Sequence, residues 1–196
     1  MTRQRSISPG PFSGSAGFSL VELAAAIGVI GILSASAVMM LPNAIQAARS
    51  DGGMTQVISE LRLARDRAIS ERRDMEVRFL APNEIQIWRQ EVPTALGRTL
   101  VHSVRLENRI EFVLMAGLPD TPDGFGNATA VDFEDAATLF FRAEGMFTDA
   151  NANLDPINGT VFLGVPLRPE TARAVTVFGP TALIRGYRWT DQQWVD

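Results

Sequence analysis

Hydrophobic residues follow three successive patterns along the chain. Residues 1–17 are polar, rich in Gly, Pro and Ser, and show neither a helical nor a strand period. An apolar run follows, in which the nineteen residues from Leu23 to Leu41 carry no charge. As a helix this run would reach about 28 Å, close to the ~30 Å hydrocarbon core of a bilayer. The pattern predicts a membrane-spanning helix over residues 18–42.

A helical period continues beyond this run. Pro42 removes a helical hydrogen bond and predicts a kink, and Gly52-Gly53 predicts a second bend. Residues 43–73 are expected to form an amphipathic continuation of the helix. Its apolar stripe consists of residues spaced by four, three and four positions: Val57, Leu61, Ala64 and Ala68.

Beyond Asp74 the period changes to two, which predicts a β-rich globular domain over residues 74–196. The strand candidates are 75–80, 84–89, 100–106, 110–114, 130–133, 138–142, 160–163, 174–178 and 183–189. Residues 117–127 and 148–158 are rich in turn-forming residues and are expected to be loops. Together these patterns predict the α+β class, with an N-terminal helical part followed by a β-rich domain.

Charge and composition exclude several functions. All 18 basic residues are Arg, and 22 acidic residues give a net charge of -4. Because residues 1–17 hold two Arg and no acid, removing them leaves -4 - 2 = -6. An acidic chain disfavours general binding to nucleic acid. The absence of Cys excludes disulfides and thiolate metal sites. No phosphate loop, nucleophile elbow or metal-binding helix motif is present, so we expect no enzyme and no cofactor.

The charges on either side of the apolar run predict its orientation. Arg3 and Arg5 precede the run, whereas Arg49 and Asp51 offset each other after it, which predicts a cytoplasmic N-terminus and an exported remainder.

Glu22 is the most informative residue of the N-terminal segment. A lone carboxylate at the edge of such a run costs several kcal/mol if it is charged and unpaired. No Arg or His in the helix lies near it, so an amine newly created at Phe18 is a candidate partner.

The segment Gly17-Phe18-Ser19-Leu20-Val21-Glu22-Leu23 resembles the leader of type IV pilins and type II secretion pseudopilins. The resemblance implies that a prepilin peptidase cuts between Gly17 and Phe18 and methylates the new amine of Phe18. It implies that Glu22 pairs with the amine of a neighbouring subunit during filament assembly. It also implies a pilin fold, in which one long N-terminal helix packs its second half on an antiparallel sheet. An inner-membrane assembly platform is an implied partner, and the globular domain would be periplasmic on a single-pass anchor.

Motifs in the C-terminal half narrow the resemblance to one group within this family. Its successive motifs are 139–145 (LFFRAEG), 158–163 (NGTVFL), 174–177 (AVTV), 184–189 (IRGYRW) and the final Trp194. Their order is similar to that in H-type minor pseudopilins and in related minor pilins of type IV pili. The implied function is a structural subunit of a type II secretion pseudopilus, which helps to export folded proteins across the outer membrane.

Two alternatives remain open at this point. A minor type IV pilin would act in pilus assembly or DNA uptake, and Arg185 and Arg188 are its candidate DNA contacts. Related DNA-binding pilins carry a Gly-Arg-x-Arg cluster, whereas here Gly179 is followed by Pro-Thr-Ala, so nucleic acid is an unlikely partner. An ordinary secreted domain would be cut after Ala37, at the A-x-A site formed by Ala35-Ser36-Ala37.

Three further groups of residues are candidates for metal binding, catalysis or ligand binding. Alternate oxygen-bearing residues form a weak calcium candidate: Asp149, Asn151, Asn153 and Asp155. A calcium-binding EF-hand would need Gly and Glu where Leu154 and Thr160 stand, so a solvated turn is the alternative. His102, the only histidine, has no nucleophile at motif spacing, and the three Trp residues are expected in the core or at its rim.

Overall fold

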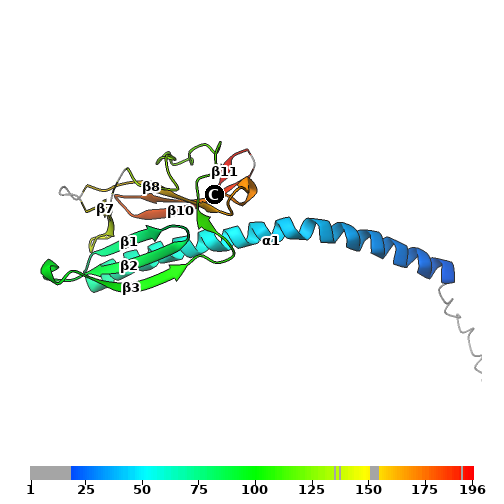
Figure 1. Cartoon of the computed structure of the whole chain (residues 1–196), viewed down its shortest axis with the longest axis horizontal. Coiled ribbons are helices and arrows are strands. Elements are labelled where there is room, and N and C mark those ends of the chain that lie inside the picture. The colour runs from blue at the N-terminus through cyan, green and yellow to red at the C-terminus, as the bar shows by residue number, and fades with distance from the viewer. Residues whose placement is uncertain (1–18, 135, 137, 151–154, 191) are drawn as a thin grey trace, which may run out of the picture. The chain divides into compact units, whose positions relative to one another are not determined.

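The computed structural model describes residues 19–134, 136, 138–150, 155–190 and 192–196, with the side chains of 37–43 outside the description. The chain divides into two compact units, residues 1–42 and 43–196. The elements, shown in Figure 1, are α1 (Leu20–Glu71), β1 (Met75–Leu80), β2 (Glu84–Gln90), η1 (Thr94–Leu96), β3 (Arg98–Arg105), β4 (Glu111–Phe112), β5 (Val131–Asp132), β6 (Leu139–Phe141), β7 (Phe147–Asp149), β8 (Gly159–Gly164), η2 (Pro169–Thr171), β9 (Arg173–Phe178), β10 (Leu183–Trp189) and β11 (Trp194–Val195).

Helix α1 is a single element of 52 residues. It passes through Pro42 and through Gly52-Gly53 without a break in its helical assignment. A proline removes one backbone hydrogen bond of the helix. A long helix tolerates this loss because its other residues keep their i to i−4 hydrogen bonds. The two predicted ranges, 18–42 and 43–73, therefore both contribute to one helix, which extends over Leu20–Glu71.

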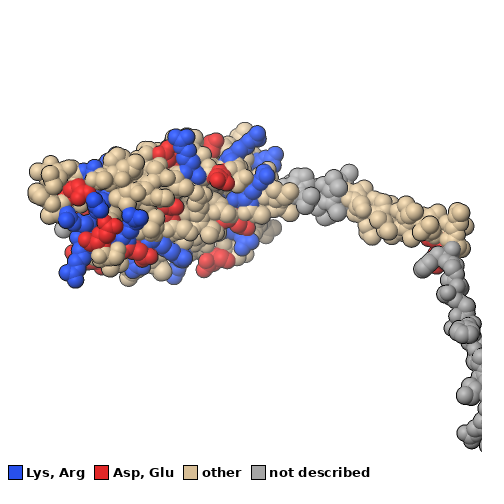
Figure 2. Space-filling model, turned by 90° about the horizontal axis from the view of Figure 1, so that it is seen from below, with Lys and Arg blue, Asp and Glu red and all other residues tan. Residues whose placement is uncertain are grey.

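The first part of α1 is apolar and exposed. Eight large side chains between Leu20 and Leu33 are 57% to 84% exposed within this chain. In Figure 2 this part of the helix is almost entirely tan, whereas Arg and acidic side chains are mixed over the unit of residues 43–196. Among the described residues, no helix is both long and apolar enough to cross a membrane.

The predicted membrane-spanning helix, residues 18–42, begins at Phe18, which is not described, and ends within a stretch whose side chains lie outside the description, 37–43. The predicted leader, residues 1–17, lies entirely outside the described residues.

The second part of α1 builds the core of the globular unit. The predicted stripe is confirmed, because all four of its residues are fully buried: Val57, Leu61, Ala64 and Ala68. They share one cluster with apolar residues such as Ile85 of β2 and Val175 of β9. In Figure 1, β1, β2 and β3 run alongside this part of α1. The predicted α+β class is confirmed.

The strands form two antiparallel sheets rather than the one that the sequence predicts. Sheet A has the order β3-β2-β1-β6-β7, and sheet B has the order β11-β10-β9-β8-β4, with β5 also paired to β8. Gly186 of β10 allows sheet B to approach α1, since a Cβ there would lie 2.9 Å from Met54 Sδ and Ile58 Cδ1. Both sheets therefore share one helix and one apolar core.

Most predicted strands are present, and two short ones are additional. Strand β7 lies partly in the range predicted to be a loop, and β11 follows the last predicted strand. The hairpin between β6 and β7 turns at Gly145, whose φ of 88° suits glycine. Residues 117–127 contain no strand, as expected. Only two or three residues of β7 and β11 pair, which is too short for a period of two to be visible.

Candidate functional site

The first turn of α1 is built by a serine and a glutamate three residues apart. Ser19 precedes the helix, and its Oγ accepts a hydrogen bond from the backbone N–H of Glu22 at 3.2 Å. This is the Ser-x-x-Glu spacing of a capping box. A carboxylate in the first turn is also stabilised by the partial positive charge of the helix N-terminus. The serine hydrogen bond thus uses the backbone of Glu22, while its carboxylate adds a favourable charge at the start of the helix.

Glu22 is the only charged residue in α1 before Arg49. Its side chain is exposed, and within the described part of the chain it forms no ion pair. Its predicted partner is the amine of Phe18. Gly17 and Phe18 lie outside the described residues, so the cleavage site and the methylation site stay predictions. The helix presents an acid surrounded by exposed aliphatic side chains, a surface that lipid or other subunits can cover.

A buried arginine links α1 to sheet B. Arg173 of β9 is only 1% exposed, and its Nε donates to Asp51 Oδ1 of α1 at 2.6 Å. Its other nitrogens donate to the carbonyl oxygens of Ala172, at 2.8 Å, and Ala47, at 3.3 Å. The sequence pairs Asp51 with Arg49 only as offsetting charges, so this partner, 122 positions away, was missed. The contact fixes the start of the globular unit on its sheet.

The two arginines considered for DNA contact each lie beside an acid. Arg185 Nη1 donates to Asp123 Oδ1 at 2.8 Å, and Arg188 Nη1 lies 4.0 Å from Asp51 Oδ2. A hydrogen bond with Tyr187 and the charge of Asp123 raise the pKa of Arg185. Burial raises the pKa of Tyr187. The structure therefore places Arg185 in a polar network with Asp123 and Tyr187, and Arg188 at the edge of the Arg173 contact.

The calcium candidate is only partly described. Asn151 and Asn153 lie outside the described residues, together with 152 and 154. Asp149 ends β7, where its Oδ1 accepts from Ala150 N at 2.6 Å, and Asp155 is exposed. Among the described residues, no group of three or more His, Cys, Asp or Glu is placed to hold a metal ion. The four-oxygen site stays a prediction.

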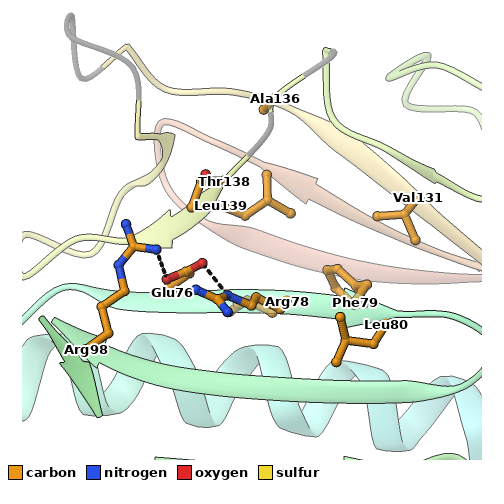
Figure 3. Close-up of a pocket in the computed structure, with 10 residues that line it drawn as sticks. Glu76, Arg78, Phe79, Leu80, Arg98, Val131, Ala136, Thr138 and Leu139 are labelled. Carbon is orange, nitrogen blue, oxygen red and sulfur yellow. Dashed lines mark hydrogen bonds and ion pairs between the residues drawn. The ribbon is translucent and has the colours of Figure 1, made fainter. Parts of the chain in front are cut away.

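A buried carboxylate on sheet A is held between two arginines. Glu76 of β1 is 2% exposed, and its two oxygens lie 2.5 Å from Arg78 Nε and 2.5 Å from Arg98 Nη1 (Figure 3). The three residues line an open cavity of about 430 Å³ beside Thr138 and Leu139. Alternation along β1 places Glu76 on the polar face, so its burial was missed. Both carboxylate oxygens lie in ion pairs, and the pair with Arg98 joins β1 to β3.

The remaining candidates serve packing. His102 Nε2 lies 3.2 Å from Glu60 Oε2, so the histidine joins β3 to α1. Trp194 is buried and its Nε1 donates to Pro119 O at 2.9 Å. Trp189 packs on Trp194, and Trp88 lies under the guanidinium of Arg78 at 4.8 Å. The expected core and rim positions of the three tryptophans are confirmed.

Comparisons with known proteins give one similar fold. No protein-family model matches the chain, and no curated protein matches its sequence. A solved structure described as that of the minor pseudopilin EpsH from the Type 2 Secretion System of Vibrio cholerae is similar, with a TM-score of 0.45 and 16% sequence identity. The alignment covers 73% of this chain and 97% of that one.

Proposed function

We propose that this chain is a minor pseudopilin, a structural subunit of a type II secretion pseudopilus rather than an enzyme. It is held in the inner membrane by residues 18–42, with a cytoplasmic N-terminus and a periplasmic globular unit. A prepilin peptidase removes residues 1–17 and methylates Phe18. The subunit then joins other pseudopilins through the assembly platform, and the filament helps to export folded proteins.

The observation that carries this proposal is the contrast between the two parts of one helix. The part after Asn43 buries its apolar stripe in the chain's own core. The part before it leaves eight large aliphatic side chains exposed around a single charge, Glu22. Such a surface needs a lipid or protein cover. The leader motif lies immediately before this surface. In the pilin and pseudopilin family that the motif resembles, such a leader precedes a helix that membrane lipid and other subunits cover.

The alternative, a minor type IV pilin in DNA uptake, relies on Arg185 and Arg188. Each guanidinium lies within 4.0 Å of a carboxylate oxygen. A neighbouring acid lowers the positive potential available to a phosphate. The contacts of these two residues therefore favour the secretion role over the DNA-binding role.

The proposal is tested with Glu22→Gln in the native host. Gln preserves the Ser-x-x-Gln capping box and removes only the charge. We expect the fraction of the chain in sheared filaments to fall roughly tenfold, equivalent to about 1.4 kcal/mol. Asp66→Asn, an exposed acid in the second part of α1, is the matched control and should leave this fraction unchanged. Equal filament content for wild type and Glu22→Gln would contradict the assembly role.

Deletion of the gene distinguishes a role in type II secretion from a role in a type IV pilus. We expect accumulation of folded exoproteins in the periplasm, with surface motility and DNA uptake unchanged. Normal secretion with lost motility or uptake would assign the chain to a type IV pilus.

A further inference from the structure

Two turns of the globular unit place side chains in a backbone conformation that usually requires glycine. In the first, Ile110 N donates to Glu107 O at 3.1 Å, and the two central residues are Asn108, with φ of 60°, and Arg109, with φ of 63°. Positive φ at both central positions defines a type I′ turn, whose second central residue is typically Gly. Here that position is occupied by an exposed arginine.

The second turn presents an exposed leucine. Arg168 N donates to Val165 O at 3.1 Å, with Pro166 and Leu167 at the centre. Leu167 has φ of 67°, at the position where a type II turn favours Gly, and its side chain is 97% exposed. A leucine in this conformation gains nothing from packing in its own chain. The exposed side chains of Arg109 and Leu167 are therefore available to a partner outside the chain.

The two turns and α1 enclose a basic cavity. Arg49, Arg109 and Arg168 line an open cavity of about 380 Å³ together with Gln46, Asn108 and Val165, and no carboxylate lines it. All three arginines are exposed, and none forms an ion pair within the described ranges. Four acids stand two positions along the chain from these arginines, and none of them lines the cavity: Asp51, Glu107, Glu111 and Glu170. The cavity is therefore positive in a chain with more acids than arginines.

We propose that Arg49, Arg109, Leu167 and Arg168 form a membrane-contact surface that binds anionic phospholipid headgroups. Three guanidiniums suit phosphodiester oxygens, and an exposed leucine beside them suits the interfacial layer above the acyl chains. Arg49 lies seven residues after Pro42, or roughly 10 Å along a helix. The inference rests on the proposed function, in which residues up to Pro42 lie in the membrane. The surface would orient the globular unit before the subunit enters the filament.

The test uses the full chain in phospholipid vesicles. Since the chain has no Cys, Leu167→Cys offers a single attachment site for a polarity-sensitive nitrobenzoxadiazole dye. In vesicles containing one quarter phosphatidylglycerol we expect blue-shifted emission and at least twofold weaker quenching by aqueous acrylamide than in pure phosphatidylcholine. The protection should fall at 0.5 M NaCl because salt screens headgroup charge. Leu96→Cys, at a leucine that is 69% exposed in η1, is the matched label and should show no lipid dependence.

The arginine requirement is tested on the same labelled chain. Arg109→Gln with Arg168→Gln should abolish the phosphatidylglycerol-dependent protection, whereas Arg62→Gln with Arg72→Gln, two other exposed arginines, should retain it. Equal quenching in both lipids, or protection that survives in the first pair, would overturn the proposal. Protection that requires another pseudopilin rather than anionic lipid would assign the surface to a protein partner. Loss of protection on adding millimolar glycerophosphate would assign it to a soluble phosphate compound.

Failure of this inference is distinguishable from failure of the proposed function. A mature chain that begins at Phe18 but shows no lipid-dependent protection removes the membrane-contact surface alone. A chain that is not processed at Phe18 removes the pilin pathway, whatever the labelled leucine reports.

Discussion

Asp51 Oδ1 in α1 and Nε of Arg173 in β9 lie 2.6 Å apart, and they join two parts of the chain that are 122 residues apart. The guanidinium is buried, whereas the Asp51 side chain is 38% exposed. Arg173 is thus a cation held inside the protein. Its only carboxylate partner within 4.0 Å in the described chain comes from the helix, so helix and sheet are electrostatically dependent on each other.

Asp51→Asn should therefore destabilise the globular unit. Breaking a fully buried ion pair costs about 3–5 kcal/mol, and partial exposure of Asp51 reduces our expectation to about 1–3 kcal/mol. Urea unfolding followed by circular dichroism measures the change. Asp66→Asn is the control and should change the free energy of unfolding by less than about 0.5 kcal/mol, because Asp66 is an exposed acid of the same helix that forms no ion pair among the described residues. Equal midpoints for the two variants would contradict the anchoring role of Asp51.

Two glycines should respond in opposite directions to alanine. At Gly159 a Cβ would overlap the ring of Phe133 and the carbonyl oxygen of Asp132, so Gly159→Ala should destabilise by about 1–3 kcal/mol. At Gly52, inside α1, a Cβ meets nothing within 4 Å, so Gly52→Ala should stabilise by about 0.5–1 kcal/mol. Thermal unfolding of both variants checks the pair. Destabilisation by Gly52→Ala would mean that this helical position is not open.

Acid should weaken the contact between β2 and β3. Hydrogen bonds from Gln86, Ser103 and Arg105 lower the pKa of Glu84 from its usual 4.5. A group whose folded pKa is lowered contributes stability above its unfolded pKa and loses it as the pH falls through the folded pKa. Ser103→Ala should reduce the urea midpoint at pH 7, and the difference from wild type should shrink at pH 3. A difference that stays constant with pH would separate Ser103 from the ionisation of Glu84.

Leu167→Gly should leave the fold intact. The leucine is almost fully exposed, so its removal loses little packing, and Gly adopts a φ of 67° without strain. We expect a free energy of unfolding that is unchanged or raised by up to about 1 kcal/mol. Destabilisation by more than 1 kcal/mol, measured by urea unfolding, would show that Leu167 packs within its own chain.

The sequence predicts those features that depend on local period. The stripe from Val57 to Ala68 and the strands β1 and β2 follow directly from spacings of three, four and two. The division into two sheets could not be predicted, because it depends on which strands pair across the chain. Glu76 shows the same limit, since alternation assigns it to the polar face and only tertiary packing buries it.

The candidate functional residues also divide into those that the sequence indicates and those that only the structure brings together. The leader and Glu22 are contiguous in sequence, so a motif can indicate them. Arg49, Arg109 and Arg168 come from α1 and two separate turns, so no spacing brings them together. Positive φ at Arg109 and Leu167 also has no signal in the sequence, because both turn types normally use Gly there.

The N-terminus of the mature protein tests the central claim most directly. Intact mass and terminal sequencing of the chain purified from its native membrane should give a start at Phe18 with a methylated amine. That result would confirm processing by the pilin pathway and supply the predicted partner of Glu22. A start at Val38, or an uncut chain beginning at Met1, would contradict the account.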